Sequence, residues 1–146
     1  MSERTWRITL VLIGGAHVGL AAWAAVSPES FVRTIANFGL QNIHLVHDFA
    51  ACAATFGLGM LIAARVPAWR QAALTLAAVW TGLHAVSHIL DAGDARPTFV
   101  GPIEAVALLL LTGVLAALAY GSASQGVNVQ GTQPHRKDSD ARHRSS

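Results

Sequence analysis

Charged side chains are scarce in this chain of 146 residues, because only 12% of them are Asp, Glu, Lys or Arg. Soluble domains carry about 25% charged residues on average. Hydrophobic residues make up 53% of the chain, and the mean hydropathy is +0.45. This combination argues against a large soluble domain and indicates a membrane protein.

Cysteine is almost absent too, and several common functional motifs are missing. Cys52 is the single cysteine, so an intrachain disulfide is excluded, and the lack of a C-x-x-C-H motif excludes ordinary c-type haem attachment. There is no phosphate-binding loop and no nucleophile elbow. The formal net charge is only +2, with much of the basicity near the C-terminus, so no nucleic-acid partner is expected.

Long apolar segments are what the chain does contain. A spanning helix needs about 20 mostly apolar residues, and four stretches reach that length: 8–26, 43–64, 68–90 and 100–120. They predict an all-α fold, a bundle of four transmembrane helices over residues 1–120. The first segment is too long for the apolar core of a signal peptide, so we expect it to be retained. Residues 121–146 are polar and predict a disordered cytoplasmic tail.

The distribution of Lys and Arg predicts the orientation of the bundle. Basic residues concentrate before the first segment, around the 65–70 turn and after the fourth segment. Cytoplasmic loops carry such an excess. We therefore expect both termini in the cytoplasm, a multi-pass protein of the plasma (inner) membrane, and outward-facing loops at 27–42 and 91–99. Trp6 and Trp69 fit an aromatic belt at the inner interface.

The connections between segments also carry signals. Ser27-Pro28-Glu29 is typical of a helix start, and it predicts a short helix on the outer interface that ends near Gly39. Val66-Pro67 predicts a tight inner turn. Segments 43–64 and 68–90 should then form an antiparallel hairpin, in contact along their length.

Two clusters of histidine and acid lie near the outer ends of this predicted hairpin. In the first cluster, His44, His47 and Asp48 have the spacing i, i+3 and i+4, which puts their side chains on one helical face. The second cluster runs from His84 to Asp91 with the spacing i, i+4 and i+7, which also follows one face. At a rise of about 1.5 Å per residue, both clusters and an acid on the fourth segment share one layer. The predicted site comprises His44, His47, Asp48, His84, His88, Asp91 and Glu104.

The chemistry of these side chains favours a metal site. Ionisable groups are costly within a bilayer, so they mark a candidate functional site. Imidazole and carboxylate ligands suit transition metals such as Zn, Fe or Cu, which helix bundles often hold between facing helices. Four histidines would also suffice for b-type haem. A bound metal could activate water or act as a redox centre, but the sequence does not decide whether the protein is an enzyme.

Other readings of the same residues stay open. The clusters could handle protons or a quinone in a non-enzymatic subunit or a small transporter. They could also be structural, because histidines near helix ends reach toward the interface and polar pairs bind helices together. His17 could make an interhelical hydrogen bond or serve as an extra ligand. The bilayer is an expected partner, while a membrane-protein partner or a second copy of the chain is left open.

These motifs resemble a family of small four-helix bacterial membrane proteins that is distantly DoxX-like. The resemblance rests on Asn42-x-His44-x-x-His47-Asp48, on Arg65, and on Leu83-His84-Ala85-Val86-Ser87-His88-x-x-Asp91. It covers about residues 7–120 and implies the four-helix fold and a membrane location. DoxX relatives are associated with oxidoreductase or quinone-linked systems but lack this histidine pattern, so the resemblance implies no particular reaction.

Overall fold

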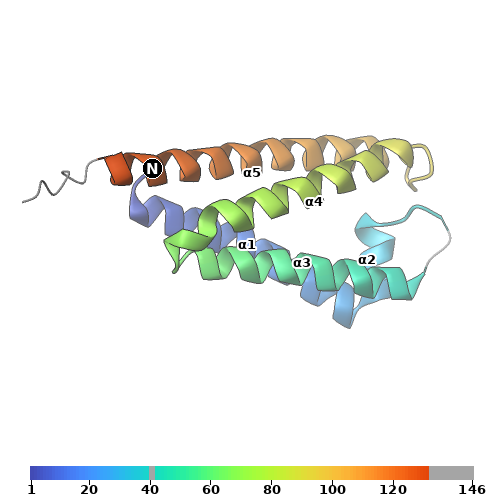
Figure 1. Ribbon diagram of the computed structural model, residues 1–146. Coiled ribbons are helices and arrows are strands. Elements are labelled where there is room, and N and C mark those ends of the chain that lie inside the picture. Colours follow the sequence, from blue (N-terminus) through green and yellow to red (C-terminus); the bar gives the residue numbers. More distant parts are fainter. Residues whose placement is uncertain (40–41, 132–146) are drawn as a thin grey trace, which may run out of the picture.

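Every regular element in the described part of the chain is helical. The computed structural model describes residues 1–39 and 42–131, the side chains of 125–131 excepted (Figure 1). The elements are α1 (Glu3–Val26), α2 (Pro28–Ile35), α3 (Ile43–Ala63), the 3₁₀ helix η1 (Pro67–Trp69), α4 (Arg70–Leu90) and α5 (Val100–Gly131).

Four of these helices are long and apolar enough to cross a membrane. They are α1, α3, α4 together with η1, and α5 up to Ser124. The prediction of an all-α bundle of four spanning helices is confirmed, and the chain is a small multi-pass membrane protein. The helix starts follow the local sequence: Ser2 accepts a hydrogen bond from the amide of Thr5, and Asn42 caps α3 at the amide of His44.

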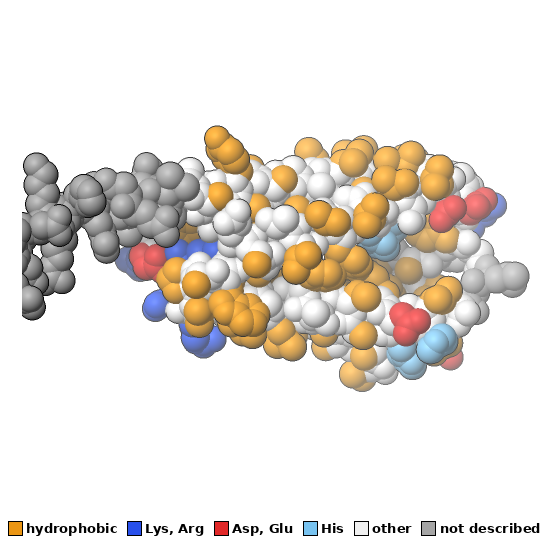
Figure 2. Space-filling view, in the orientation of Figure 1, with side chains coloured by type: hydrophobic (Ala, Val, Ile, Leu, Met, Phe, Trp, Pro, Cys, Tyr) orange, Lys and Arg blue, Asp and Glu red, His pale blue; other side chains and the backbone are white. Residues whose placement is uncertain are grey.

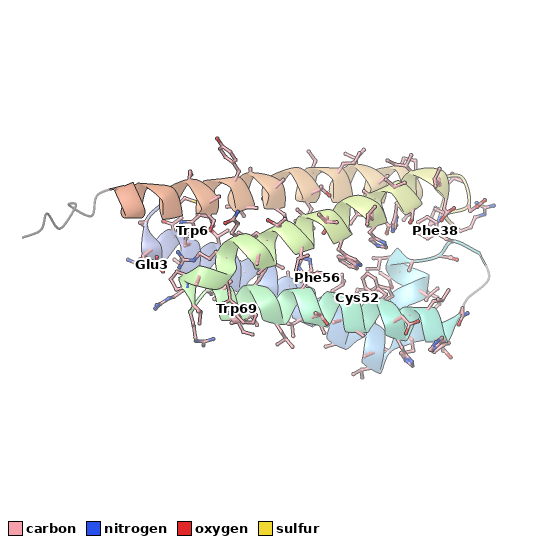
Figure 3. All side chains as sticks on the ribbon, in the orientation of Figure 1. Glu3, Trp6, Phe38, Cys52, Phe56 and Trp69 are labelled. Carbon is pink, nitrogen blue, oxygen red and sulfur yellow. The ribbon has the colours of Figure 1, made fainter. Side chains whose placement is uncertain are left out.

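The bundle is built from two helix pairs, α1 with α3 and α4 with α5. α3 and α4 meet near η1 and diverge toward the opposite end, where α2 lies between the pairs (Figure 1). The expected hairpin with contact along its whole length is therefore wrong. Large aromatic side chains fill the space between α3 and α4, and Figure 3 places Phe56 there, stacked on Trp80 at 5.1 Å between ring centroids.

Two glycines allow α1 and α3 to pack closely. A Cβ atom added to Gly14 would lie 2.8 Å from the carbonyl oxygen of Gly57. A Cβ atom added to Gly57 would lie 2.9 Å from the carbonyl oxygen of Gly14 and 2.8 Å from Val18. Small residues at such a crossing let two backbones approach closely, which favours association of membrane helices.

The η1 end of the bundle is tied together by an ion pair. The guanidinium of Arg70 donates to both carboxylate oxygens of Glu3, at 3.0 Å from Nη1 to Oε2, and to the carbonyl of Ala63. Arg70 also lies over the ring of Trp6, which is only 1% exposed (Figure 3). The prediction that Trp6 belongs to an interfacial belt is therefore wrong, because the ring packs in the core. Trp69, in contrast, is 53% exposed.

The short helix α2 begins as predicted, but it ends earlier. Pro28 is its first residue, and the helix stops at Ile35, before the predicted end near Gly39. Phe38 lies in the following loop, where its ring meets the ring of His88 edge-on at 5.0 Å. Gly39 has a φ of +104°, a conformation that favours glycine, and there the chain turns toward α3.

The last helix continues beyond the predicted end of the fourth span. α5 extends to Gly131, whereas the sequence analysis placed a disordered tail from residue 121 onward. Polar residues and glycine weaken a helix by about 1 kcal/mol each at most, which is less disruptive than proline, and no proline interrupts this stretch. The rest of the predicted tail, 132–146, lies outside the described residues.

Candidate functional site

A cavity of about 680 Å³ lies between the two helix pairs, toward the α2 end. Figure 2 shows the molecule hollowed between α4 and α3, with the pale blue of histidine at the wall. The cavity lies where α3 and α4 diverge, and α2 fills only part of the space between them, because Phe31, Val32 and Ile35 of α2 line the cavity. Its volume is in the range of sites for small organic ligands.

Aromatic rings line much of this cavity. The Trp80 indole and the His84 imidazole stack almost parallel, with centroids 5.4 Å apart and planes 7° apart. The ring of Phe49 on α3 contacts both, with centroid distances of 5.9 Å to Trp80 and 5.7 Å to His84. Phe31 on α2 extends the series, 5.3 Å from Phe49. Flat apolar faces of this kind suit a planar or hydrocarbon ligand.

Polar groups converge at one end of the cavity. The rings of His84 and His88 lie 4.6 Å apart, edge to face. Nδ1 of His88 is 3.3 Å from Oε2 of Glu104 on α5. Neither of these two atoms is exposed, and neither has a hydrogen-bond partner in the described structure. The two side chains therefore form a close pair whose facing atoms make no hydrogen bond.

The unsatisfied pair has a physical cost. A buried polar atom without a partner costs about 1–3 kcal/mol, and the great majority of such atoms in proteins are paired. His88 and Glu104 both line the cavity. A polar group of a ligand, a shared proton or a cation at this point would relieve the cost.

The first predicted cluster does not reach this site. His44, His47 and Asp48 are exposed, and the α3 residues that line the cavity are on another face of the helix. His44 and Asp48 pair with each other at 3.6 Å, with side chains 82% and 60% exposed. The expectation that the two polar stripes face each other is wrong. The residues of this segment that line the cavity are Phe49 and its neighbours on one face of the helix: Asn42, Leu45, Val46 and Ala53.

The second cluster does line the cavity. His84, His88 and Glu104 contribute to its wall, as predicted for a polar layer between the helices. Asp91 also lines it, but at an exposed position where it ends α4. Within the described residues, no group of three or more His, Cys, Asp or Glu side chains is arranged to hold a metal ion. The assignment of the seven residues as metal ligands thus stays a prediction, and four of them lie together.

The structure adds cavity residues that the sequence analysis did not select. His17 on α1 is 8% exposed and lines the cavity, where it was only a weak candidate. The aromatic residues Phe31, Phe49 and Trp80 also line the cavity, and none of them was among the predicted site residues. The helical periodicity of α3 could have identified Phe49 as a cavity residue. Phe49 lies on the same face as Leu45 and Asn42, opposite to the face of His44.

Comparison with protein-family models, curated proteins and solved structures finds no match for this chain. The DoxX-like relationship therefore stays a prediction. The functional argument rests on the geometry of the cavity.

Proposed function

We propose that this membrane protein binds a small amphiphilic molecule from the bilayer in the cavity between its helix pairs. The observation that carries the proposal is the cavity itself, which has apolar and aromatic walls and, at one end, a histidine–glutamate pair whose facing atoms make no hydrogen bond. Ligand sites typically combine a mainly apolar lining with a few polar groups that fix the ligand's orientation. The bilayer is the source because the hollow lies between two helices that can span the membrane.

The polar head of the ligand would sit against His88 and Glu104. These side chains offer a nitrogen and a carboxylate oxygen 3.3 Å apart, so a hydroxyl group that reaches them can donate to the carboxylate and accept from the imidazole N–H. The ring of His84 and the indole of Trp80 would contact a flat head group. A quinol, the reduced form of a quinone, is one class of amphiphile with such a head, and its hydroxyl protons could exchange with the imidazole–carboxylate pair.

The proposed setting is the plasma membrane, with both termini in the cytoplasm and the cavity in the outer half of the bilayer. The arginines in the first turns of α1, Arg4 and Arg7, and those around η1 support this orientation. The polar end of the cavity would then lie near the outer lipid head groups, where an amphiphile places its own polar head. The role is that of a binding subunit or small transporter, and it requires no covalent chemistry.

A probe of matching chemistry tests the proposal. We expect 4-hexylresorcinol, which has a flat hydroxylated ring and an apolar tail, to raise the thermal midpoint of the protein in lipid nanodiscs. The double variant His88→Leu, Glu104→Leu should fold, because replacing a buried polar pair by apolar residues is often neutral. It should lose about tenfold in probe affinity, because one or two hydrogen bonds to the head group disappear.

The matched control is His47→Leu, Asp48→Leu, which removes an imidazole and a carboxylate from the exposed face of α3. This variant should bind the probe like the wild type. Equal affinity in both double variants would contradict the placement of the head group, and no stabilisation of the wild type by amphiphiles would contradict the proposed function.

A transition metal is the second candidate. It is favoured by the close approach of an imidazole nitrogen of His88 and a carboxylate oxygen of Glu104 that make no hydrogen bond, with His84 as the neighbouring imidazole. Nitrogen and carboxylate ligands of this kind suit Zn, Fe or Cu, and His84 or His88 would be the residues to hold a b-type haem.

Metal analysis of untagged protein discriminates the two candidates. If the protein binds a metal, we expect one ion per chain in the wild type. The double variant His84→Ala, His88→Ala should lose this ion, and the control double variant His44→Ala, His47→Ala should retain it. The retained ion in the control is expected because the exposed pair lies on another face of α3 from the cavity. Metal-free wild-type protein that still binds the amphiphilic probe would exclude the metal and leave the first proposal intact.

A further inference from the structure

Only one of the two ring nitrogens of His17 makes a hydrogen bond within the described residues. Its Nδ1 lies 2.9 Å from the carbonyl oxygen of Ile13, one turn earlier in α1. A carbonyl oxygen can only accept a hydrogen bond, so Nδ1 carries the proton. In the neutral ring, Nε2 is then an acceptor, and it lies at the edge of the imidazole that points away from the α1 backbone. The residue lines the cavity.

His17 also stands at the same level as the polar end on α4. The ion pair between Glu3 and Arg70 aligns the starts of α1 and α4, which run in the same direction. His17 follows Glu3 by fourteen positions, and His84 follows Arg70 by fourteen positions. At 1.5 Å per residue both lie about 21 Å along their helices from that ion pair. The two histidines therefore line different walls of the cavity at one depth.

We propose that His17 is a specificity-determining residue that accepts a hydrogen bond from a hydroxyl group of the bound amphiphile. This inference rests on the proposed function and narrows its ligand to molecules with a hydrogen-bond donor in addition to the group held by His88 and Glu104. The fixed tautomer is the reason, since Nε2 can pair with a hydroxyl but not with an ether or a ketone oxygen. An acceptor placed against it would leave two lone pairs facing each other.

A pair of probes isolates this contact. 4-Hexylresorcinol carries two hydroxyl groups, and its monomethyl ether keeps one of them for the polar end. We expect the wild-type protein in nanodiscs to bind the diol about tenfold more tightly than the ether, the size of one net hydrogen bond. In His17→Phe, which keeps a flat ring of similar size but has no nitrogen, the preference should vanish. His17→Gln, whose side-chain oxygen is an acceptor, should restore part of it.

The outcomes separate this inference from the proposed function. If His17→Phe keeps the tenfold preference, or if the wild type binds both probes equally, His17 does not select for a hydroxyl group and the inference fails while binding stands. If neither probe binds the wild type, the proposed function fails as well. Thermal midpoints without probe show whether each variant is folded. Preferential binding of hexanoate over the diol through His17 would mean a charged imidazole and would also overturn the assignment.

Discussion

Ligand binding is expected to be lost when the cavity is filled from α5 by Ala107→Trp. Ala107 lines the cavity, so an indole at this position occupies space that the ligand needs. A ligand present at about 100 times its Kd stabilises the folded protein by about 2.7 kcal/mol. We expect 4-hexylresorcinol to raise the thermal midpoint of the wild type accordingly, and the variant's affinity to fall at least tenfold.

The adjacent position provides the control for this prediction. Val106 is 56% exposed and does not line the cavity, so Val106→Trp adds the same side chain on another face of the same helix. This variant should respond to the probe like the wild type. A similar loss in both variants would show that an added indole disturbs α5 in general, and undiminished binding by Ala107→Trp would place the probe elsewhere.

Replacing Gly14 by leucine is expected to separate α1 from α3. A Cβ atom at this position would lie 2.8 Å from a backbone oxygen of Gly57, and a backbone oxygen cannot move aside as a flexible side chain can. Overpacking a close contact costs about 1–3 kcal/mol and sometimes more. We expect Gly14→Leu to lower the free energy of unfolding by about 3 kcal/mol, measured by denaturation in increasing SDS.

Gly15 is the matched control, because a Cβ atom added there meets nothing within 4 Å. Gly15→Leu should change the free energy of unfolding by less than about 1 kcal/mol, in the stabilising direction, since leucine favours the helix. Comparable loss of stability in both variants would argue against the close crossing of α1 and α3.

The sequence predicted the helices well because bilayer length imposes a strong constraint on apolar segments. The turn at Val66-Pro67 and the start of α2 at Pro28 were also local signals, and both appear in the structure. The helix pairing was not predictable in the same way. It depends on Gly14 and Gly57, which are distant in sequence, and on the bulk of rings such as Trp80 that hold α3 and α4 apart.

The sequence predicted only part of the candidate site, because the site also depends on how the helices pair. Periodicity showed that His84 and His88 share a face, but it could not show which face of α3 turns toward them. The polar face of α3 was predicted to form the site because ionisable groups within a bilayer usually mark functional residues. In the structure, Phe49 on the apolar face lines the cavity instead. His17 was underrated because its height was taken from its position in the segment, without the Glu3–Arg70 ion pair that sets the register of α1 against α4.

The most direct test of the account is native mass spectrometry of the untagged protein, excised from its membrane in nanodiscs without any added probe. The account predicts one small organic molecule bound to each wild-type chain, retained in Val106→Trp and absent from Ala107→Trp. Fragmentation of that molecule would then show whether it carries the hydroxyl group expected opposite His17. A wild-type chain that carries no more bound organic molecule than Ala107→Trp would contradict the claim that the cavity is a binding site.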